Sequence, residues 1–400
     1  MESLRELYKI GFGPSSSHTM GPSFASNYFL NLYPNAFRYE VVLSGSLSLT
    51  GRGHLTDVKI RESFADRKLE IIFSRNFENL PHPNTMDFFA YDEKDTILGH
   101  RRILSVGGGS IRIIGDDERQ PKQVYPFADF DEIRDYAEKN HMTLPEIVYQ
   151  FEDANIKDYL MQVWVTMVNA IDRGITNQSI LPGTLKISRK APTLSHPILP
   201  ENDVAFYTRT VMCYAYAASE ENASGGIIVT APTCGSGGII PAVLRFLKET
   251  KHLDNSKMID ALAVASLIGN VVKQNASISG AEAGCQAEIG TATAMASAAI
   301  AFLEGLSLDQ IECSAEVSLE HHLGLTCDPV EGYVQIPCIE RNAVCSLRAF
   351  DSVNIARYLA QARRVTFDVV VKTMNETGRD LIDSYRETAT GGLAKTFGKR

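Results

Sequence analysis

Residues 143–153 read TLPEIVYQFED, and the sequence changes character around this stretch. Thr143 and Glu146 have the spacing of a capping box, in which each side chain binds the other residue's backbone N–H at a helix start. Beyond it the pattern predicts one helix after another and almost no strands. The predicted helices cover residues 156–172, 203–220, 257–275, 281–304, 308–323, 340–364 and 366–386.

Before this stretch the pattern is mixed. Branched and aromatic residues separated by turn formers predict strands, and they lie at residues 39–45, 68–74, 86–92 and 101–115. Helices are predicted at residues 4–10 and 22–33, the second beginning at Pro22, which suits a first helical turn. The fold class is therefore α+β: a small mixed α/β N-terminal domain, residues 1–148, joined to a larger, mostly α-helical domain, residues 155–400.

Composition excludes several classes of protein. The 400 residues carry a formal net charge of −9, whereas nucleic-acid-binding surfaces are usually basic. The longest apolar stretches are short or interrupted, so no membrane span is expected. The start, MESLRELYKIG, lacks the apolar segment of a signal peptide, and a cytoplasmic location is expected.

The seven cysteines all lie in the second half of the chain. An odd number without a secretion signal argues against a disulfide framework, and the absence of a C-x-x-C pair argues against zinc and thioredoxin-like sites. Cys285, Cys327 and Cys338 are widely spaced, and two of them sit beside proline or glycine. Such cysteines can bind an iron–sulfur cluster once the fold gathers them, or they can be buried structural thiols. Spacing alone leaves both open.

Four strings carry a resemblance to a known family. EHHLGLTCDPVEGYVQIPCIERNA (320–343) resembles the signature of the iron–sulfur L-serine dehydratases, also called L-serine ammonia-lyases. GCQAEIG (284–290), TAPTCGSGGIIPAVL (230–244) and GPSSSHTMGP (13–22) resemble three further motifs of that family, in the same order. At Cys234 the chain departs from the family, many of whose members have asparagine there.

The resemblance implies an activity and a cofactor. L-serine, a small amino-acid substrate, would be converted to pyruvate and ammonia in amino-acid degradation and gluconeogenesis, by a homo-oligomer, expected to be a dimer. Cys285, Cys327 and Cys338 would hold a [4Fe–4S] cluster. Three thiolates leave one iron open as a Lewis acid for the departing hydroxyl, while a base removes the α-proton.

The serine-rich stretch is the predicted substrate-binding loop. Ser15, Ser16, Ser17 and Thr19 precede a predicted helix, where hydroxyls and free backbone N–H groups favour a carboxylate. The alternative is a helix cap, but one serine would suffice for that. These residues are therefore expected to grip the acid end of the substrate.

Histidine suits proton transfer near neutral pH. His54 lies in SLTGRGHLTD, which resembles the family's GKGHGTD stretch, and is predicted to be the base. His18 is the second candidate and is expected to orient the substrate. His321 and His322 are expected to be packing or supporting residues.

Three alternatives stay open. Pyridoxal phosphate bound by Lys190 and the CGSGG string (234–238) would reach the same products, but it leaves the cysteine strings unexplained. A related cluster enzyme could act on threonine or cysteine. A non-catalytic protein could use the cluster to sense iron or oxygen, although no basic output surface is evident.

The role of Arg341 also stays open, because this residue could bind the substrate carboxylate or form an ordinary ion pair.

Overall fold

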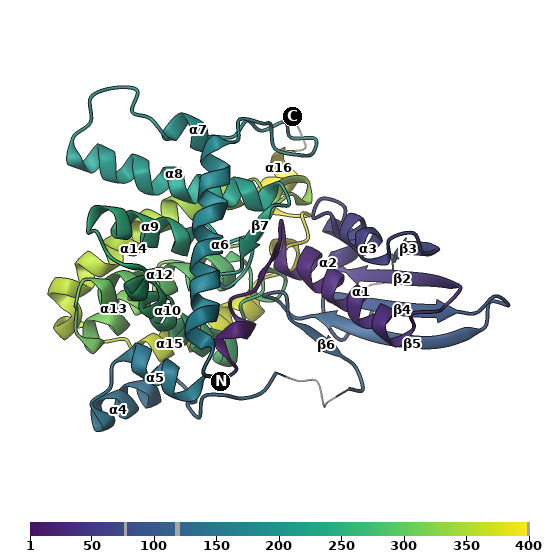
Figure 1. Ribbon diagram of the computed structural model, residues 1–400, viewed down its shortest axis with the longest axis horizontal. Helices are drawn as coiled ribbons and strands as arrows, with labels where there is room; N and C mark the ends of the chain where they lie inside the picture. The colour runs from purple at the N-terminus through teal and green to yellow at the C-terminus, as the bar shows by residue number, and fades with distance from the viewer. Residues whose placement is uncertain (76–77, 117–120, 398–400) are drawn as a thin grey trace.

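The computed structural model describes residues 1–75, 78–116 and 121–397. It has two parts: a small lobe built on a β-sheet and a larger helical body, seen at the right and left of Figure 1. The predicted α+β fold class is confirmed.

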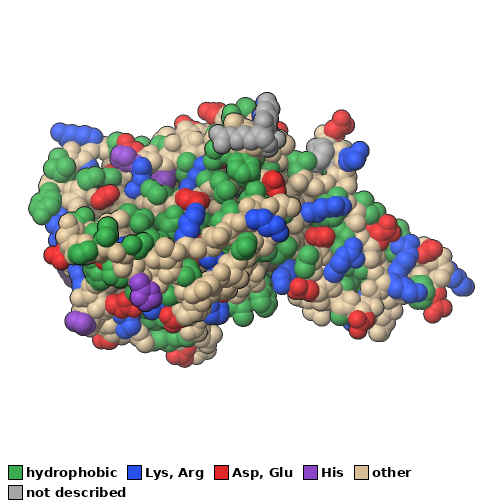
Figure 2. Space-filling view, turned by 90° about the horizontal axis from the view of Figure 1, so that it is seen from above, with side chains coloured by type: hydrophobic (Ala, Val, Ile, Leu, Met, Phe, Trp, Pro, Cys, Tyr) green, Lys and Arg blue, Asp and Glu red, His purple; other side chains and the backbone are tan. Residues whose placement is uncertain are grey.

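The surface carries charges of both signs. Figure 2 shows Lys and Arg side chains interspersed with Asp and Glu over the face that it displays.

The small lobe contains a five-stranded sheet in the order β3-β2-β4-β5-β6. β2 pairs in parallel with β3, and the other pairs are antiparallel. The strands are β2 (Arg38–Gly45), β3 (Leu69–Phe73), β4 (Asn84–Tyr91), β5 (Ile97–Ser105) and β6 (Ile111–Ile113). Alternate residues of the strands point inward, and Val41 and Phe88 pack with Phe29 of α1 (Gly21–Leu32) and Phe64 of α3 (Thr56–Phe64).

The first three predicted strands and the helix at 22–33 are confirmed to within a few residues. The predicted strand at 101–115 is two strands, because three consecutive glycines, residues 107–109, have positive φ and form a turn. The predicted helix at 4–10 is wrong. A single 3₁₀ turn, Leu4–Glu6, is followed by β1 (Ile10–Phe12), which pairs antiparallel with β7 (Ile227–Val229) of the helical body.

The helical body surrounds two buried helices, α10 and α12, which are rich in small residues. A helix that is apolar on all sides must be covered on all sides. The helices of this part are α4 (Phe130–Asn140), α5 (Leu144–Phe151), α6 (Ile156–Thr176), α7 (Ala191–Leu194), α8 (Asp203–Ala223), α9 (Ile239–Thr250), α10 (Asn255–Asn275), α11 (Gly280–Ala283), α12 (Thr291–Leu303), α13 (Leu308–Glu320), α14 (Cys338–Leu359), α15 (Phe367–Asp380) and α16 (Gly392–Phe397).

The capping box is confirmed, since Glu146 accepts a hydrogen bond from the backbone N–H of Thr143 at the start of α5. The predicted helix at 281–304 is interrupted after α11, where Gly284 has a φ of 72°. A π-helical turn, Gln286–Gly290, then leads into α12. Among the described residues, six helices lie outside the helices predicted from the sequence: the short α2 (Ser46–Thr50), α3, α4, α7, α9 and α16.

The hydrophobic core of the helical body includes Leu4, Leu7, Phe130 and Leu144 together with residues of α10 and α12. The domain limits of 1–148 and 155–400 stay a prediction, and the packing of α4 and α5 on this core favours an earlier boundary. Among the described helices, none combines the length and apolarity that a membrane span needs.

Candidate active site

A small, mostly enclosed cavity lies where the N-terminal segment, the small lobe, the helical body and the C-terminal segment meet. Its lining residues are Pro14, Ser15, His54, Gly235, Cys285, Glu288, Ile289, Cys327, Pro329, Val334, Cys338 and Glu387. The fold thus brings together the three predicted cysteines, the predicted base and one residue of the serine-rich stretch. Ser16, Ser17, His18 and Thr19 are buried close by but do not line this cavity.

Each of the three cysteines is positioned by a different local structure. Cys285 directly precedes the π-helical turn, and Cys338 begins α14 after Pro337. Cys327 is held by the C-terminal segment: its N–H donates to the carbonyl of Tyr385 at 2.8 Å, and its carbonyl accepts from the N–H of Glu387 at 2.9 Å. All three are buried free thiols.

The electrostatics of the cavity favour a thiolate at Cys285. A hydrogen bond from the Cys327 thiol lowers the pKa of Cys285 to about 7, and the nearby Arg341 guanidinium acts in the same direction against burial. Burial, together with the charge of Cys285, raises the pKa of Glu288 to about 8. The ligand atoms of Cys285, Glu288 and Cys327 all lie within 4.8 Å of one another, and soft thiolate donors gathered in this way suit iron–sulfur chemistry.

The other four cysteines lie outside the cavity. Cys213, Cys234 and Cys313 pack in separate apolar clusters, and burial raises the pKa of each thiol. The Sγ atom of Cys345 lies 3.2 Å from Nε2 of His322.

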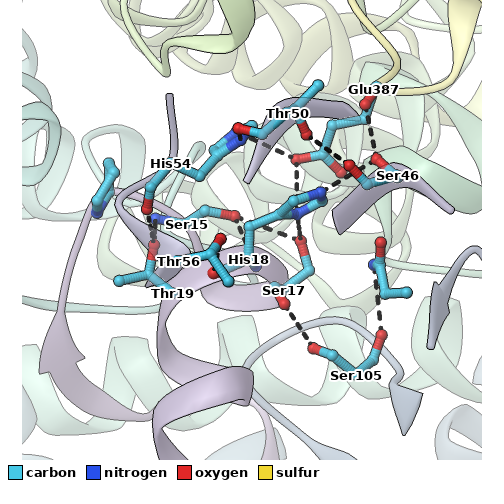
Figure 3. A network of polar contacts seen from close by, with 12 residues as sticks. Ser15, Ser17, His18, Thr19, Ser46, Thr50, His54, Thr56, Ser105 and Glu387 are labelled. Carbon is cyan, nitrogen blue, oxygen red and sulfur yellow. Dashed lines mark hydrogen bonds and ion pairs between the residues drawn. The ribbon is translucent and has the colours of Figure 1, made fainter. Parts of the chain in front are cut away.

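The side chains of the serine-rich stretch form a continuous chain of hydrogen bonds (Figure 3). Ser15 and Ser17 are linked through their hydroxyls, Ser17 contacts Nδ1 of His18 at 2.8 Å, and His18 Nε2 contacts Ser46 at 3.0 Å. Ser46 in turn donates to the carbonyl of Glu387 at 2.7 Å. Most of these hydroxyls therefore have partners within the protein.

His18 and His54 are fully buried, and their ring centroids are 4.4 Å apart. The two rings differ in how many of their nitrogens have a hydrogen-bond partner among the described residues. Both ring nitrogens of His18 are engaged, by Ser17 and Ser46. Nδ1 of His54 donates to the Thr50 carbonyl at 3.0 Å, whereas its Nε2 has no hydrogen-bond partner in the described part of the chain. Burial lowers the pKa of His54 to about 4, so its ring is neutral at pH 7.

Sequence patterns did not indicate Glu387. Its Oε1 lies 3.5 Å from Nδ1 of His18 and 3.6 Å from Nε2 of His54. Burial, with the charges of Glu288 and Cys285, raises the pKa of this carboxyl well above its usual range. It lies in a loop, YRETATGG (385–392), without a motif that marks it.

Other sequence candidates lie at the edge of the site or away from it. Arg341 donates to the Thr326 carbonyl at 2.8 Å and lies near the cysteine thiols. Lys190 pairs with Glu340 and is not among the cavity-lining residues. His321 is exposed, and His322 is buried with its Nδ1 on the Ser318 carbonyl.

Comparison with known proteins shows to which family the chain belongs. Residues 3–65 match the family model "Serine dehydratase beta chain" and residues 73–394 match "Serine dehydratase alpha chain". Relatives include an L-serine dehydratase of Haemophilus influenzae, 38% identical with 98% of this chain and 99% of that protein aligned. L-serine dehydratase 1 of Escherichia coli is 39% identical (98% and 99% aligned), and an L-serine dehydratase of Streptomyces coelicolor is 37% identical (98% of each aligned).

Both family models match one continuous polypeptide here, and the cysteine motifs that carried the resemblance lie in the alpha-chain match. The chain therefore belongs to the serine dehydratase family, with its beta-chain and alpha-chain regions in a single chain.

Proposed function

We propose that this chain is an L-serine ammonia-lyase that converts L-serine to pyruvate and ammonia. The observation that carries the proposal is one cavity that holds three buried free thiols beside a buried neutral histidine, one ring nitrogen of which has no partner among the described residues. Names of full-length relatives support the choice of L-serine over threonine or cysteine.

We assign Cys285, Cys327 and Cys338 as the ligands of a [4Fe–4S] cluster. The donor set fits: the thiols are free, Cys285 favours the thiolate, and Arg341 provides a compensating positive charge. When bound, such a cluster with three protein ligands supplies a Lewis acid that assists departure of the β-hydroxyl group.

The start of the helix that follows Ser15 is the proposed carboxylate site. Ser15 caps this helix by accepting from the N–H of His18 at 3.1 Å. The N–H groups of Ser16 and Ser17 lie in its first turn, directly after the cavity-lining residue Ser15, and because intrahelical acceptors are lacking there they can bind an anion at the edge of the cavity. With the Ser17 and Thr19 hydroxyls engaged inside the protein, the backbone rather than the hydroxyls supplies most of these donors.

His54 is the proposed base. Because its Nδ1–H donates to the Thr50 carbonyl, its Nε2 carries the lone pair and can accept the α-proton. The carboxylate of Glu387, 3.6 Å from Nε2, would stabilise the resulting imidazolium. His18, with both ring nitrogens engaged, would hold the serine-rich loop in place. The cytoplasmic location, the homodimer and the link to gluconeogenesis also belong to this proposal.

The test is pyruvate release from L-serine by protein purified anaerobically and reconstituted with iron and sulfide, before and after exposure to air. We expect activity that appears with iron and is lost in air. Each of the variants Cys285→Ala, Cys327→Ala and Cys338→Ala should fail to bind the cluster. His54→Ala should keep the visible spectrum of the cluster and lose turnover. Activity that needs pyridoxal phosphate instead of iron would refute the mechanism.

A further inference from the structure

Glu387 has a carboxylate oxygen that the hydrogen-bond network leaves unused. Oε1 faces the two histidines, whereas Oε2 is buried and has no hydrogen-bond partner among the described residues. Leaving a buried carboxylate oxygen unpaired is costly. The backbone N–H of Glu387 donates to the Cys327 carbonyl, and its carbonyl accepts from the Ser46 hydroxyl. The residue therefore cannot move out of the cavity unless these two hydrogen bonds break.

Among the residues that the structure describes, the cavity lining contains two glutamates and three cysteines but neither lysine nor arginine, and the nearby Arg341 guanidinium interacts with the cysteine thiols. An α-amino acid brings its own cation, the α-ammonium group. A site that holds the carboxylate at backbone N–H groups still needs an acceptor for this ammonium.

Position distinguishes the two glutamates. The ligand atom of Glu288 lies within 4.8 Å of the sulfurs of Cys285 and Cys327, on the metal side of the cavity. Glu387 lies beside Nε2 of His54, the proposed base. The α-proton and the α-ammonium are bonded to the same carbon, so a carboxyl group beside the base is within reach of the ammonium of a substrate that the base deprotonates.

We propose that Oε2 of Glu387 binds the α-ammonium group of the substrate and so makes the site specific for amino acids over acids of the same shape without an amino group. This inference rests on the proposed function. Burial favours the protonated form of this carboxyl as long as no cation is beside it. A bound ammonium favours the ionised carboxylate, whose Oε2 then contacts the substrate while Oε1 faces His54.

The experiment uses L-alanine and propionate, which have the same carbon skeleton and differ in the ammonium group. Neither has the β-hydroxyl, so neither can be dehydrated. Their dissociation constants are measured by anaerobic calorimetry on the full-length, iron-loaded protein. We expect the wild-type protein to prefer L-alanine. In Glu387→Gln, which keeps the size and the backbone bonds, this preference should fall about tenfold to a hundredfold, the strength of a hydrogen bond to a charged group.

Glu376→Gln, on an exposed position of α15, is the control with the same change in charge and should keep the wild-type preference. Iron content and circular dichroism should be unchanged in both variants. A Glu387→Gln protein with normal iron and undiminished preference would overturn the inference. So would a wild-type protein that binds both ligands equally, a result that needs no variant to fold. Failure of the proposed function is separate, because it appears as absence of L-serine turnover in the wild-type protein.

Discussion

Acidification from pH 7 to pH 5 is expected to remove about 2 kcal/mol of folding stability through His54 alone. In the fold, burial lowers the pKa of this ring from 6.5 to about 4. Between these values the unfolded chain binds a proton that the folded protein excludes. The stability contributed by the neutral ring is therefore complete above pH 6.5 and is lost as the pH falls toward 4. Between pH 6.5 and pH 5, about 1.5 pH units, the free energy of unfolding falls by about 1.4 kcal/mol for each unit.

The measurement is urea unfolding of the iron-free protein, followed by circular dichroism at pH 7 and at pH 5. Iron-free protein is used so that metal release does not contribute. The wild-type protein should lose about 2 kcal/mol more than His54→Gln over this interval. Gln keeps an N–H group that can donate to the Thr50 carbonyl. His196→Gln, at an exposed histidine, is the control and should behave like the wild type. Equal losses in wild type and His54→Gln would refute the assignment of His54 as a buried neutral ring.

Two further changes test the packing. Glu312 is fully buried and forms ion pairs with Arg134 and Arg363, so Glu312→Gln should lower the free energy of unfolding by about 3 kcal/mol in urea titrations; an unchanged midpoint would contradict a shared buried carboxylate. A Cβ on Gly174 would lie 2.2 Å from the carbonyl oxygen of Ala217 in the neighbouring helix. Gly174→Ala should therefore cost about 1–3 kcal/mol and lower the melting temperature, and a neutral effect would mean that α6 and α8 can separate easily.

Local patterns were sufficient where the structure is determined locally. The capping box at Thr143 and the branched and aromatic residues of β2 and β4 are properties of neighbouring residues, and the elements that they indicate were predicted correctly. α9 was not predicted: it follows a glycine-rich string and contains Pro241, which is tolerated only because it lies in the first turn. Residues 4–10 have a helix-like composition, but they form only one 3₁₀ turn, and at Ile10 the chain already begins the strand β1, which pairs with the distant β7.

The residues of the candidate active site could likewise be predicted from the sequence only in part. The resemblance indicated three cysteines and two histidines, and the fold places all five close together. The serine-rich stretch was expected to grip the substrate carboxylate. Its sequence did not indicate that Ser17 bonds to Ser15 and His18, or that Thr19 donates to the His54 carbonyl. Glu387 could not be predicted at all. It reaches the cavity through contacts with residues 60 and 341 positions away, Cys327 and Ser46, and no local pattern records such contacts.

The pairing of β1 with β7 has a consequence for how the polypeptide can be divided. β1 and β2 lie in the beta-chain match, while β7 and β4 lie in the alpha-chain match. Two ladders thus cross the junction between the matched regions, residues 66–72, in addition to the shared cavity. The peptide bonds of this junction are therefore one connection among several. Two fragments separated there would each carry half of both ladders, and strand pairing could guide them back into one complementing enzyme.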